Sequence, residues 1–457
     1  MEEVQGLKFV SYLKESVGED AAMKVMEALG EVPSVSVRTN PFKLPKYGYD
    51  ILNEEYSKVQ WNDLGYILSE RPLFTLDPEF HSGAYYVQDS SAMFVGYTFR
   101  QVLKQIYKKG NKIRVLDLCA APGGKTTDIA ASLRLECGDE YILVANEVMK
   151  NRASILCENI AVWGDPNVVV TSVDPAAFAA LPGYFDIIIA DVPCSGEGMF
   201  RKDEDAVNQW TTEMVSVNAA RQKRIVSDVW QALSSEGIFI YSTCTFNKYE
   251  NDMNVSWIAE KCGAEVMKIE FNFDGPIHTK YGVSLLPGLV PGEGQYCAVL
   301  RKTGESVCLK PKKEKNVRLK ENYGHLKDFF NYPVTIEEKG DILTAIPNVV
   351  SVEKGFINIL RPLMSGTALG TIKGKNFVPH PDLAYSIILS DSAFTRVEID
   401  KPTALKFLHK DAIILTDKPL GLLLICHNNI PLGFIKNLGN RTNNLLPLQR
   451  RIRMDII

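Results

Sequence analysis

IRVLDLCAAPGGKTTDIA, residues 113–130, begins as a short apolar run, turns at two glycines and continues with residues that favour a helix. Gly123 and Gly124 let the backbone turn tightly and approach a ligand closely. The helix that begins near Thr126 would offer its free amide groups at the same place. The segment therefore predicts a strand, a ligand-binding turn and a helix in succession.

The same alternation continues to residue 300. Further short apolar runs are YILVAN at 141–146, NVVVTSV at 167–173, FDIIIA at 185–190 and GIFIYS at 237–242. Helix-like segments lie between them, among them NRASILCENIAV at 151–162 and VNAARQKRIVSDVWQALSSE at 217–236. Strand and helix in repeated alternation predict an α/β fold with a Rossmann-like, doubly wound and mostly parallel sheet.

The regions on either side read differently. Residues 5–30 are typical of two short amphipathic helices, and SVSVRTNPFK at 34–43 of a strand that ends in a turn, which predicts a small N-terminal α+β domain. Beyond residue 320 short apolar pieces are broken by Gly, Pro and Asn, which indicates small mixed or all-β domains. We therefore divide the chain into an N-terminal domain, a sheet domain, a basic linker with a small intermediate domain, and a C-terminal domain, at 1–100, 101–303, 304–380 and 381–457.

Composition limits the possible classes of protein. The chain has 457 residues, 46% hydrophobic and 23% charged, which suits two to four globular domains. MEEVQGLKFV at the start has no basic region followed by a long apolar one, and no uncharged stretch approaches about 18 residues. We expect a cytoplasmic monomer that does not contact membranes. Nine cysteines with no CxxC pair and six histidines without ligand spacing predict no metal site.

Acidic residues end two of the predicted strands, where ligands of such sheets bind. Glu147 follows YILVAN and lies 23 residues after Gly124, close to the interval of about 20 at which an acid holds ribose hydroxyls. Asp174 ends the next strand. Together they favour a nucleoside pocket, although each acid could instead cap a helix. GGKT also resembles the end of a P-loop, but Cys119 stands where that motif requires glycine.

A carboxylate and two thiols follow the next two strands. DVPCSG at 191–196 places Asp191 and Cys194 directly after FDIIIA, and STCT at 242–245 places Cys244 after the last parallel strand. Adjacent strands would bring all three side chains to one rim, where backbone amides are expected to lower a thiol pKa from about 8.5. The remaining thiols that we considered are expected to be inert packing, namely Cys119, Cys157, Cys262 and Cys426.

Cytosine carbon 5 does not attack a sulfonium methyl group unaided. A thiolate added to carbon 6, with a carboxylic acid hydrogen-bonded to ring nitrogen 3, makes carbon 5 nucleophilic, and a second thiol can assist release. Asp191, Cys194 and Cys244 fit that chemistry, whereas methylation of an exocyclic amine needs no thiol and typically shows D/N-P-P-Y/F in place of DVPC.

Four motifs resemble the Sun family of RNA cytosine-5 methyltransferases: LDLCAAPGGKTTD, DVPCSGEGMF, YSTCTFNKYEND and LLPGLVPGEGQYCAVLRK. SVRTNPFK and YYVQDSSAM resemble that family's N-terminal elements, and residues 380–453 resemble the PUA-like tail of its bacterial RsmF type. The resemblance implies S-adenosylmethionine as methyl donor and a cytosine of small-subunit (16S) ribosomal RNA as acceptor, either naked or in the assembled subunit.

The resemblance also implies roles for single residues. Cys244 would attack the base, Cys194 would assist release, and Asp191 would engage ring nitrogen 3 beside Lys125. Glu147 would hold the ribose of the cofactor, Asp174 its adenine end, and Arg152 would support the pocket. The methionine side of the cofactor would be lined by Cys119, Ala120, Pro122, Gly123 and Lys125.

Several alternatives stay open at this point. The same residues permit a transfer RNA substrate, or a DNA enzyme in which Cys194 attacks. A P-loop NTPase and an inactive RNA-binding assembly factor are the other classes. Cationic stretches at 310–320 (KPKKEKNVRLK) and 447–454 (PLQRRIRM) are either solvated surface or nucleic-acid contacts, and in the second we expect Arg450, Arg451 and Arg453 to meet phosphates.

Overall fold

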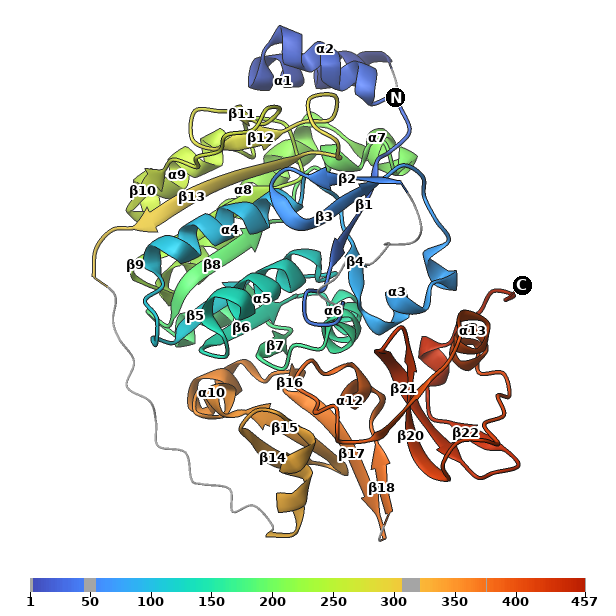
Figure 1. Cartoon of the computed structure of the whole chain (residues 1–457). Helices are drawn as coiled ribbons and strands as arrows, with labels where there is room; N and C mark the ends of the chain where they lie inside the picture. Colours follow the sequence, from blue (N-terminus) through green and yellow to red (C-terminus); the bar gives the residue numbers. More distant parts are fainter. Residues whose placement is uncertain (1–2, 45–54, 306–320, 375, 457) are drawn as a thin grey trace.

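A computed structural model describes residues 3–44, 55–305, 321–374 and 376–456 (Figure 1). The predicted N-terminal helices are present as α1 (Glu3–Val17) and α2 (Glu19–Ala28). A four-stranded antiparallel sheet of order β2-β3-β1-β4 follows. Its strands are β1 (Val35–Thr39), β2 (Tyr56–Val59), β3 (Asn62–Leu68) and β4 (Tyr85–Val87).

A ten-stranded sheet forms the centre of the molecule, and its core is β7-β6-β5-β8-β9, all parallel. These strands are β5 (Ile113–Asp117), β6 (Tyr141–Asn146), β7 (Val168–Thr171), β8 (Phe185–Asp191) and β9 (Leu233–Thr243). β13 (Gln295–Lys302) pairs antiparallel with β9, and β10 (Ala264–Met267), β11 (Ile277–His278) and β12 (Val283–Leu285) extend that side. The predicted Rossmann-like, doubly wound sheet is therefore confirmed, as a mixed sheet.

Helices cover both faces of this sheet because its strands are apolar on both sides. Val115 and Leu116 are adjacent in β5, yet they belong to two different buried clusters. The first cluster is closed by α4 (Met93–Ile106), α5 (Gly124–Cys137) and α6 (Lys150–Trp163), and the second by α8 (Thr212–Val229) and α9 (Asp252–Cys262).

One predicted helix end is wrong. Residues 233–236 are helix-like in sequence, but α8 ends at Val229, a single 3-10 turn follows, and β9 begins at Leu233. Leu233 is fully buried and pairs with Phe185 of β8. Burial against the neighbouring strand overrides local helix propensity here.

Two small β-rich units follow, as the sequence predicts. The first sheet has the order β14-β15-β17-β18, with strands at Val334–Lys339, Ile342–Pro347, Thr367–Lys373 and Asn376–Pro379. The second has the order β19-β20-β21-β22, with strands at Thr395–Glu398, Gly421–His427, Ile430–Asn437 and Thr442–Asn444. Short helices accompany them, notably α12 (Pro381–Tyr385) and α13 (Lys401–His409).

The C-terminal units dock on the central sheet domain (Figure 1). β16 (Met364–Ser365) pairs antiparallel with β7 and so becomes the edge strand of the central sheet. Glu353 also accepts hydrogen bonds from Lys112 at 2.9 Å and from Arg114 at 3.1 Å. The basic stretch 310–320 lies outside the described residues. Among the described helices none is long and apolar enough to cross a membrane.

Candidate active site

The register between β8 and β9 places the predicted carboxylate and thiols at one rim. Asp191 lies opposite Ser242 in this parallel pair, so the chain leaves both strands at the same level. Cys194 and Cys244 follow within three residues of that pair, and their Sγ atoms are 3.3 Å apart. The two thiols therefore contact each other at the carboxyl edge of the sheet.

Buried polar side chains hold the two cysteine loops together. Glu250 lies beyond Cys244 and accepts hydrogen bonds from the amide of Ser195 at 3.0 Å, from Gln222 at 2.7 Å and from Asn247 at 2.9 Å. Glu250 is fully buried. Because the Ser195 amide comes directly after Cys194, Glu250 fixes one thiol loop from the other.

Gly198 allows the loops to approach closely. Its amide donates to the carbonyl of Cys244 at 2.8 Å. A Cβ atom at this position would lie 2.8 Å from the same carbonyl oxygen and 2.9 Å from that of Glu293, and both neighbours are backbone. A side chain would therefore force the PCSG loop away from Cys244.

Asp191 is held by three donors. Lys125 Nζ donates to its Oδ2 at 2.8 Å, and Ser242 Oγ and Gln295 Nε2 donate to its Oδ1 at 2.8 and 3.0 Å. Burial opposes ionisation of Asp191, but the Lys125 charge and these hydrogen bonds outweigh it and hold the pKa below its usual value. Burial likewise disfavours charged Lys125, yet Asp191 raises its pKa. The two side chains form an ion pair, whereas the sequence reasoning expected Asp191 as a neutral acid.

The surroundings of Cys194 disfavour its thiolate form. The hydrogen bond to Cys244, followed by burial, raises the pKa of Cys194 well above its usual value. The expectation that the rim lowers this thiol's pKa is therefore wrong for Cys194, because its nearest polar neighbour is another sulfur and the Glu250 carboxylate lies close by. Cys194 is therefore held as a thiol, and either sulfur can be the donor in its contact with Cys244.

The predicted cofactor loop connects β5 to α5. Gly123 has a φ of 116° and precedes the helix, so the turn uses a backbone conformation that favours glycine. Ala120 donates its amide to the Asn146 carbonyl at 2.8 Å, and Arg152 donates to the Ala121 carbonyl at 2.8 Å. Pro122 is exposed in the same turn. The loop is thus anchored to the end of β6 and the start of α6.

Glu147 lies at the carboxyl end of β6 and is 3% exposed. Its carboxylate accepts a hydrogen bond from the Met149 amide at 2.9 Å and forms an ion pair with Arg152 at 3.3 Å. Arg152 therefore joins Glu147 to the glycine turn. The structure places these residues beside one another as the sequence predicts, with the carboxylate next to the loop.

Asp174 and Cys119 behave differently from the rest of the predicted set. Asp174 caps a 3-10 helix, η3 (Pro175–Ala180), by accepting from the Ala176 amide at 3.0 Å, and it pairs with Arg224 at 3.3 Å. Asp174 therefore caps a helix, which is the alternative that the sequence left open for it. Burial and the nearby carboxylates raise the pKa of Cys119 well above its usual value, which agrees with an inert thiol.

Sequence reasoning missed Asp117, at the end of β5. It is 1% exposed; its Oδ2 accepts from Thr126 at 2.6 Å, while its Oδ1 has no hydrogen-bond partner within the described residues. Burial raises its pKa to about 7. Its place in IRVLD, directly before the glycine turn, is the signal that could have revealed it. Ser242, Gln295 and Glu250 were missed as well, because their partners lie far away in sequence.

The C-terminal arginines do not form one set. Arg450 is taken up by ion pairs with Glu158 of α6 at 2.8 Å and with Asp382 of α12 at 2.7 Å. The expectation that Arg450 contacts phosphate is therefore not met, because two carboxylates already neutralise it. Arg451 and Arg453 are exposed.

Glu250 generates a pH-dependent prediction. Burial raises its pKa from 4.5 to about 7, so the folded protein binds this proton more tightly than the unfolded chain. The resulting stabilisation is complete below about pH 4.5 and is lost as the pH rises to about 7, with a difference on the order of 3 kcal/mol. We expect Glu250→Gln to flatten the dependence of the unfolding free energy between pH 5 and pH 8, measured by urea denaturation.

The matched control is Glu260→Gln, on the exposed side of α9, where the side chain is 71% accessible. It should keep the wild-type dependence on pH. An unchanged profile for Glu250→Gln would show that Glu250 does not titrate in this range.

Family models match three segments of the chain. Residues 104–301 match "16S rRNA methyltransferase RsmB/F", residues 7–90 match the "N-terminal domain of 16S rRNA methyltransferase RsmF", and residues 394–452 match the "Methyltransferase RsmF PUA domain". All three descriptions include the name RsmF.

Similar proteins carry the name "Ribosomal RNA small subunit methyltransferase F". The one from Pectobacterium carotovorum is 34% identical over 283 residues, 59% of this chain and 56% of that protein. The chain thus aligns with little more than half the length of that relative. The one from Shewanella piezotolerans is 27% identical over 467 residues, 96% of both chains.

Two solved structures from Pyrococcus horikoshii share the fold. A methyltransferase homologue has a TM-score of 0.53 at 24% identity and covers 64% of this chain and 94% of its own. NSun6 has a TM-score of 0.53 at 20% identity and covers 65% and 98%. Residues 104–301 are thus similar to the family described as 16S rRNA methyltransferase RsmB/F, and the flanking segments are similar to the other domains of RsmF.

Proposed function

We propose that this protein transfers a methyl group from S-adenosylmethionine to carbon 5 of a cytosine in small-subunit ribosomal RNA, through a covalent bond between Cys244 and carbon 6 of the base. The observation that carries the proposal is the contact of Cys194 with Cys244 at 3.3 Å, beside an Asp191–Lys125 ion pair. A thiol pair with an adjacent acid suits attack on a pyrimidine ring and has no use in methylation of an exocyclic amine.

Residues at the carboxyl edge suit S-adenosylmethionine. Glu147 offers carboxylate oxygens to ribose hydroxyls, and the unpartnered Oδ1 of Asp117 offers a further buried acceptor beside the glycine turn. The methionine side of the cofactor would be lined by Ala120, Pro122, Gly123 and Cys119. Arg152 would support Glu147, and Asp174 would lie at the adenine end. The bound cofactor supplies an electrophilic methyl group on a sulfonium. NSun6 from Pyrococcus horikoshii was crystallised with SFG, an analogue of this cofactor.

Cys244 starts the reaction by attacking carbon 6 of the flipped cytosine. Negative charge then develops toward ring nitrogen 3. Asp191 is ionised, so the hydrogen bond to this nitrogen comes from the Lys125 ammonium that Asp191 holds in place. Carbon 5 becomes nucleophilic as the Cys244–carbon 6 bond forms, and it accepts the methyl group.

Cys194 acts at the later stage. A water molecule then accepts the carbon-5 proton, and the electron pair of that C–H bond forms the carbon 5–carbon 6 double bond. The Cys244–carbon 6 bond breaks with its electron pair on sulfur, which becomes a thiolate. The protonated Cys194 thiol, 3.3 Å away, donates a hydrogen bond to it and so promotes release. This division of labour agrees with the raised pKa of Cys194.

The other parts of the chain would present the RNA. We propose that segments 1–100 and 381–457 bind it on either side of the catalytic segment 101–303, with 304–380 between them, as the matches at 7–90 and 394–452 support. Ribosomal RNA as substrate implies a cytoplasmic enzyme. The P-loop NTPase is disfavoured because Lys125, the residue that would meet phosphates, is occupied by Asp191. A DNA-type enzyme would use Cys194 as nucleophile, and the raised pKa of that thiol disfavours this role.

Opposite behaviour is expected from the two thiol variants. Cys194→Ala can form the adduct but releases it slowly, so a denaturing gel should show protein shifted by covalently attached RNA after incubation with RNA and S-adenosylmethionine. Cys244→Ala should show no shifted band. The control is Cys157→Ala, a half-buried thiol of α6 that should turn over like the wild type. A shifted band with Cys244→Ala alone would reverse the roles.

Glu147→Ala should weaken S-adenosylmethionine binding by on the order of 1.5 to 3 kcal/mol, because it removes charge-assisted hydrogen bonds to ribose. Isothermal calorimetry on the folded variant measures this. Glu158→Ala, an exposed acid of α6, is the matched control and should bind as the wild type does. Equal affinity for Glu147→Ala would remove this residue from the cofactor site.

Neutralising Arg451 and Arg453 together should weaken RNA binding and make it less dependent on salt. The slope of the logarithm of the binding constant against the logarithm of the salt concentration should fall by roughly 0.7 to 0.9 for each phosphate contact that is lost. Filter binding across a range of salt concentrations measures the slope. Arg450→Gln provides the comparison, since its charge is already paired and its removal should leave the slope unchanged. If the salt dependence of RNA binding has the same slope in all variants and the wild type, Arg451 and Arg453 are solvated surface residues that do not contact phosphates.

A further inference from the structure

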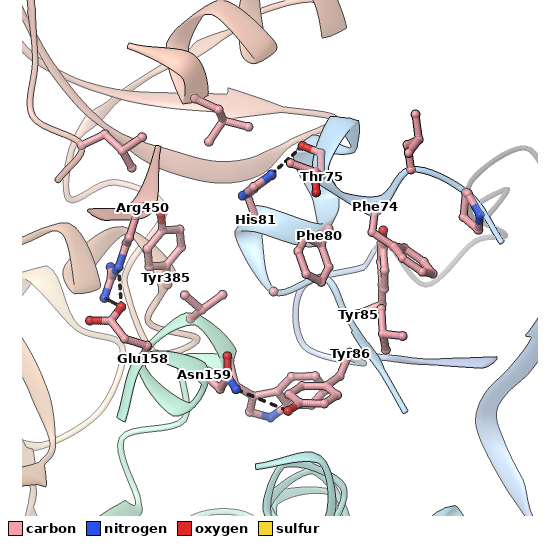
Figure 2. Close-up of a pocket in the computed structure, with 18 of the residues that line it drawn as sticks. Phe74, Thr75, Phe80, His81, Tyr85, Tyr86, Glu158, Asn159, Tyr385 and Arg450 are labelled. Atoms are coloured by element: carbon pink, nitrogen blue, oxygen red, sulfur yellow. Dashed lines mark hydrogen bonds and ion pairs between the residues drawn. The ribbon is translucent and has the colours of Figure 1, made fainter. Parts of the chain in front are cut away.

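A cavity of about 590 Å³ lies where three parts of the chain meet, apart from the residues assigned to catalysis (Figure 2). One wall is formed by residues 71–87 of the N-terminal region, including α3 (Pro78–Ser82), and a second by the end of α6. The C-terminal units complete it with Tyr385, Leu408, Leu446 and Arg450. The cavity thus adjoins the two segments that match RNA-methyltransferase accessory domains.

Aromatic rings dominate its lining. They are Phe74, Phe80, His81, Tyr85, Tyr86, Trp163 and Tyr385. Phe80 lies 6.0 Å from Phe74 and 5.5 Å from His81 between ring centroids. Figure 2 shows the rings of Phe80 and His81 on one side of the cavity and Tyr385 with Arg450 on the other. Such walls suit a flat group that can stack.

The walls carry little net charge. Arg450 is neutralised by Glu158 and Asp382, although its Nη1 has no hydrogen-bond partner within the described residues. Burial lowers the pKa of His81, which keeps the imidazole neutral. Burial also lowers the pKa of Lys43, behind Tyr385, well below its usual value. A phosphate would gain little inside, whereas an uncharged ring with hydrogen-bonding edges would fit.

The floor of the cavity touches the proposed cofactor loop. Asn159 donates to the Pro122 carbonyl at 2.7 Å, and the Tyr86 hydroxyl donates to the same carbonyl at 3.3 Å. Both residues also line the cavity. An occupant therefore rests against the two side chains that support the turn before Gly124.

We propose that this cavity receives one unpaired base of the RNA substrate, different from the cytosine that is methylated. The inference rests on the proposed function. Its volume lies in the range of small-molecule sites, and base stacking on aromatic side chains is the usual mode of single-stranded RNA recognition. The phosphates of this nucleotide stay outside, near exposed Arg71 at the rim. The captured base fixes the RNA against the catalytic domain while the target cytosine enters the thiol site.

Two variants test the proposal by opposite changes, in the full-length protein with a transcript of small-subunit ribosomal RNA. Phe80→Ala removes a stacking surface, and Thr75→Trp fills the cavity from an exposed position in the 3-10 helix Phe74–Leu76. We expect both to weaken RNA affinity about tenfold in fluorescence anisotropy, with S-adenosylmethionine affinity unchanged. Phe80→Tyr keeps the ring and should restore wild-type affinity. Val352→Trp adds an indole outside the cavity, at a position 69% exposed in segment 304–380, and should have no effect.

Ultraviolet crosslinking locates the base. In the wild type we expect a crosslink between the peptide spanning 74–86 and a nucleotide other than the methylated cytosine, and we expect Thr75→Trp to abolish it. The proposal is overturned if folded Thr75→Trp binds RNA as tightly as the wild type and keeps the crosslink. Wild-type protein that methylates no ribosomal RNA would instead overturn the proposed function, and this inference with it.

Discussion

The parallel pairing of β8 with β9, with Asp191 opposite Ser242, is the constraint on which the site depends. It sets the level at which two loops leave the sheet, and the loops then meet through backbone and buried side chains. The 3.3 Å contact between Cys194 and Cys244 follows from that register, since a slip of one residue would turn Asp191 to the other face of the sheet. Gly198 and Glu250 stabilise the close contact between the two loops, but the strand register determines where the loops begin.

Three acids near this edge show how environment alone assigns different protonation states. Asp191 is kept ionised by Lys125, Ser242 and Gln295, although it is partly buried. Asp117 and Glu250 are also buried, and for both, burial brings the pKa to about 7. A cluster in which neighbouring carboxyl groups ionise differently is typical of functional sites. The arrangement leaves one permanent ion pair flanked by two groups that can take up or lose a proton near neutrality.

Much of this organisation could be predicted from the sequence because strands, turns and strand ends are local features. The apolar runs predicted β5 to β9, and the polar residues directly after them predicted Asp191, Cys194, Cys244 and Glu147 at one rim. Gln295 and Glu250 could not be predicted, because their roles depend on β13 and on a loop contact across 55 residues. Two further errors share this origin: residues 233–236 form a strand because of tertiary burial, and Arg450 is neutralised by carboxylates remote in sequence.

The place of β16 has a consequence for how the chain must be made. A strand from beyond residue 360 completes the edge of the catalytic sheet next to β7, so the sheet is finished only after most of the chain has been synthesised. Until then β7 presents unpaired amide and carbonyl groups, which invite pairing with another copy of the same chain. Val168–Thr171 is fully buried in the finished protein, so this edge is also apolar. In the finished protein β16 pairs with Val169 and Val170, so the C-terminal part of the chain covers this edge of the catalytic sheet.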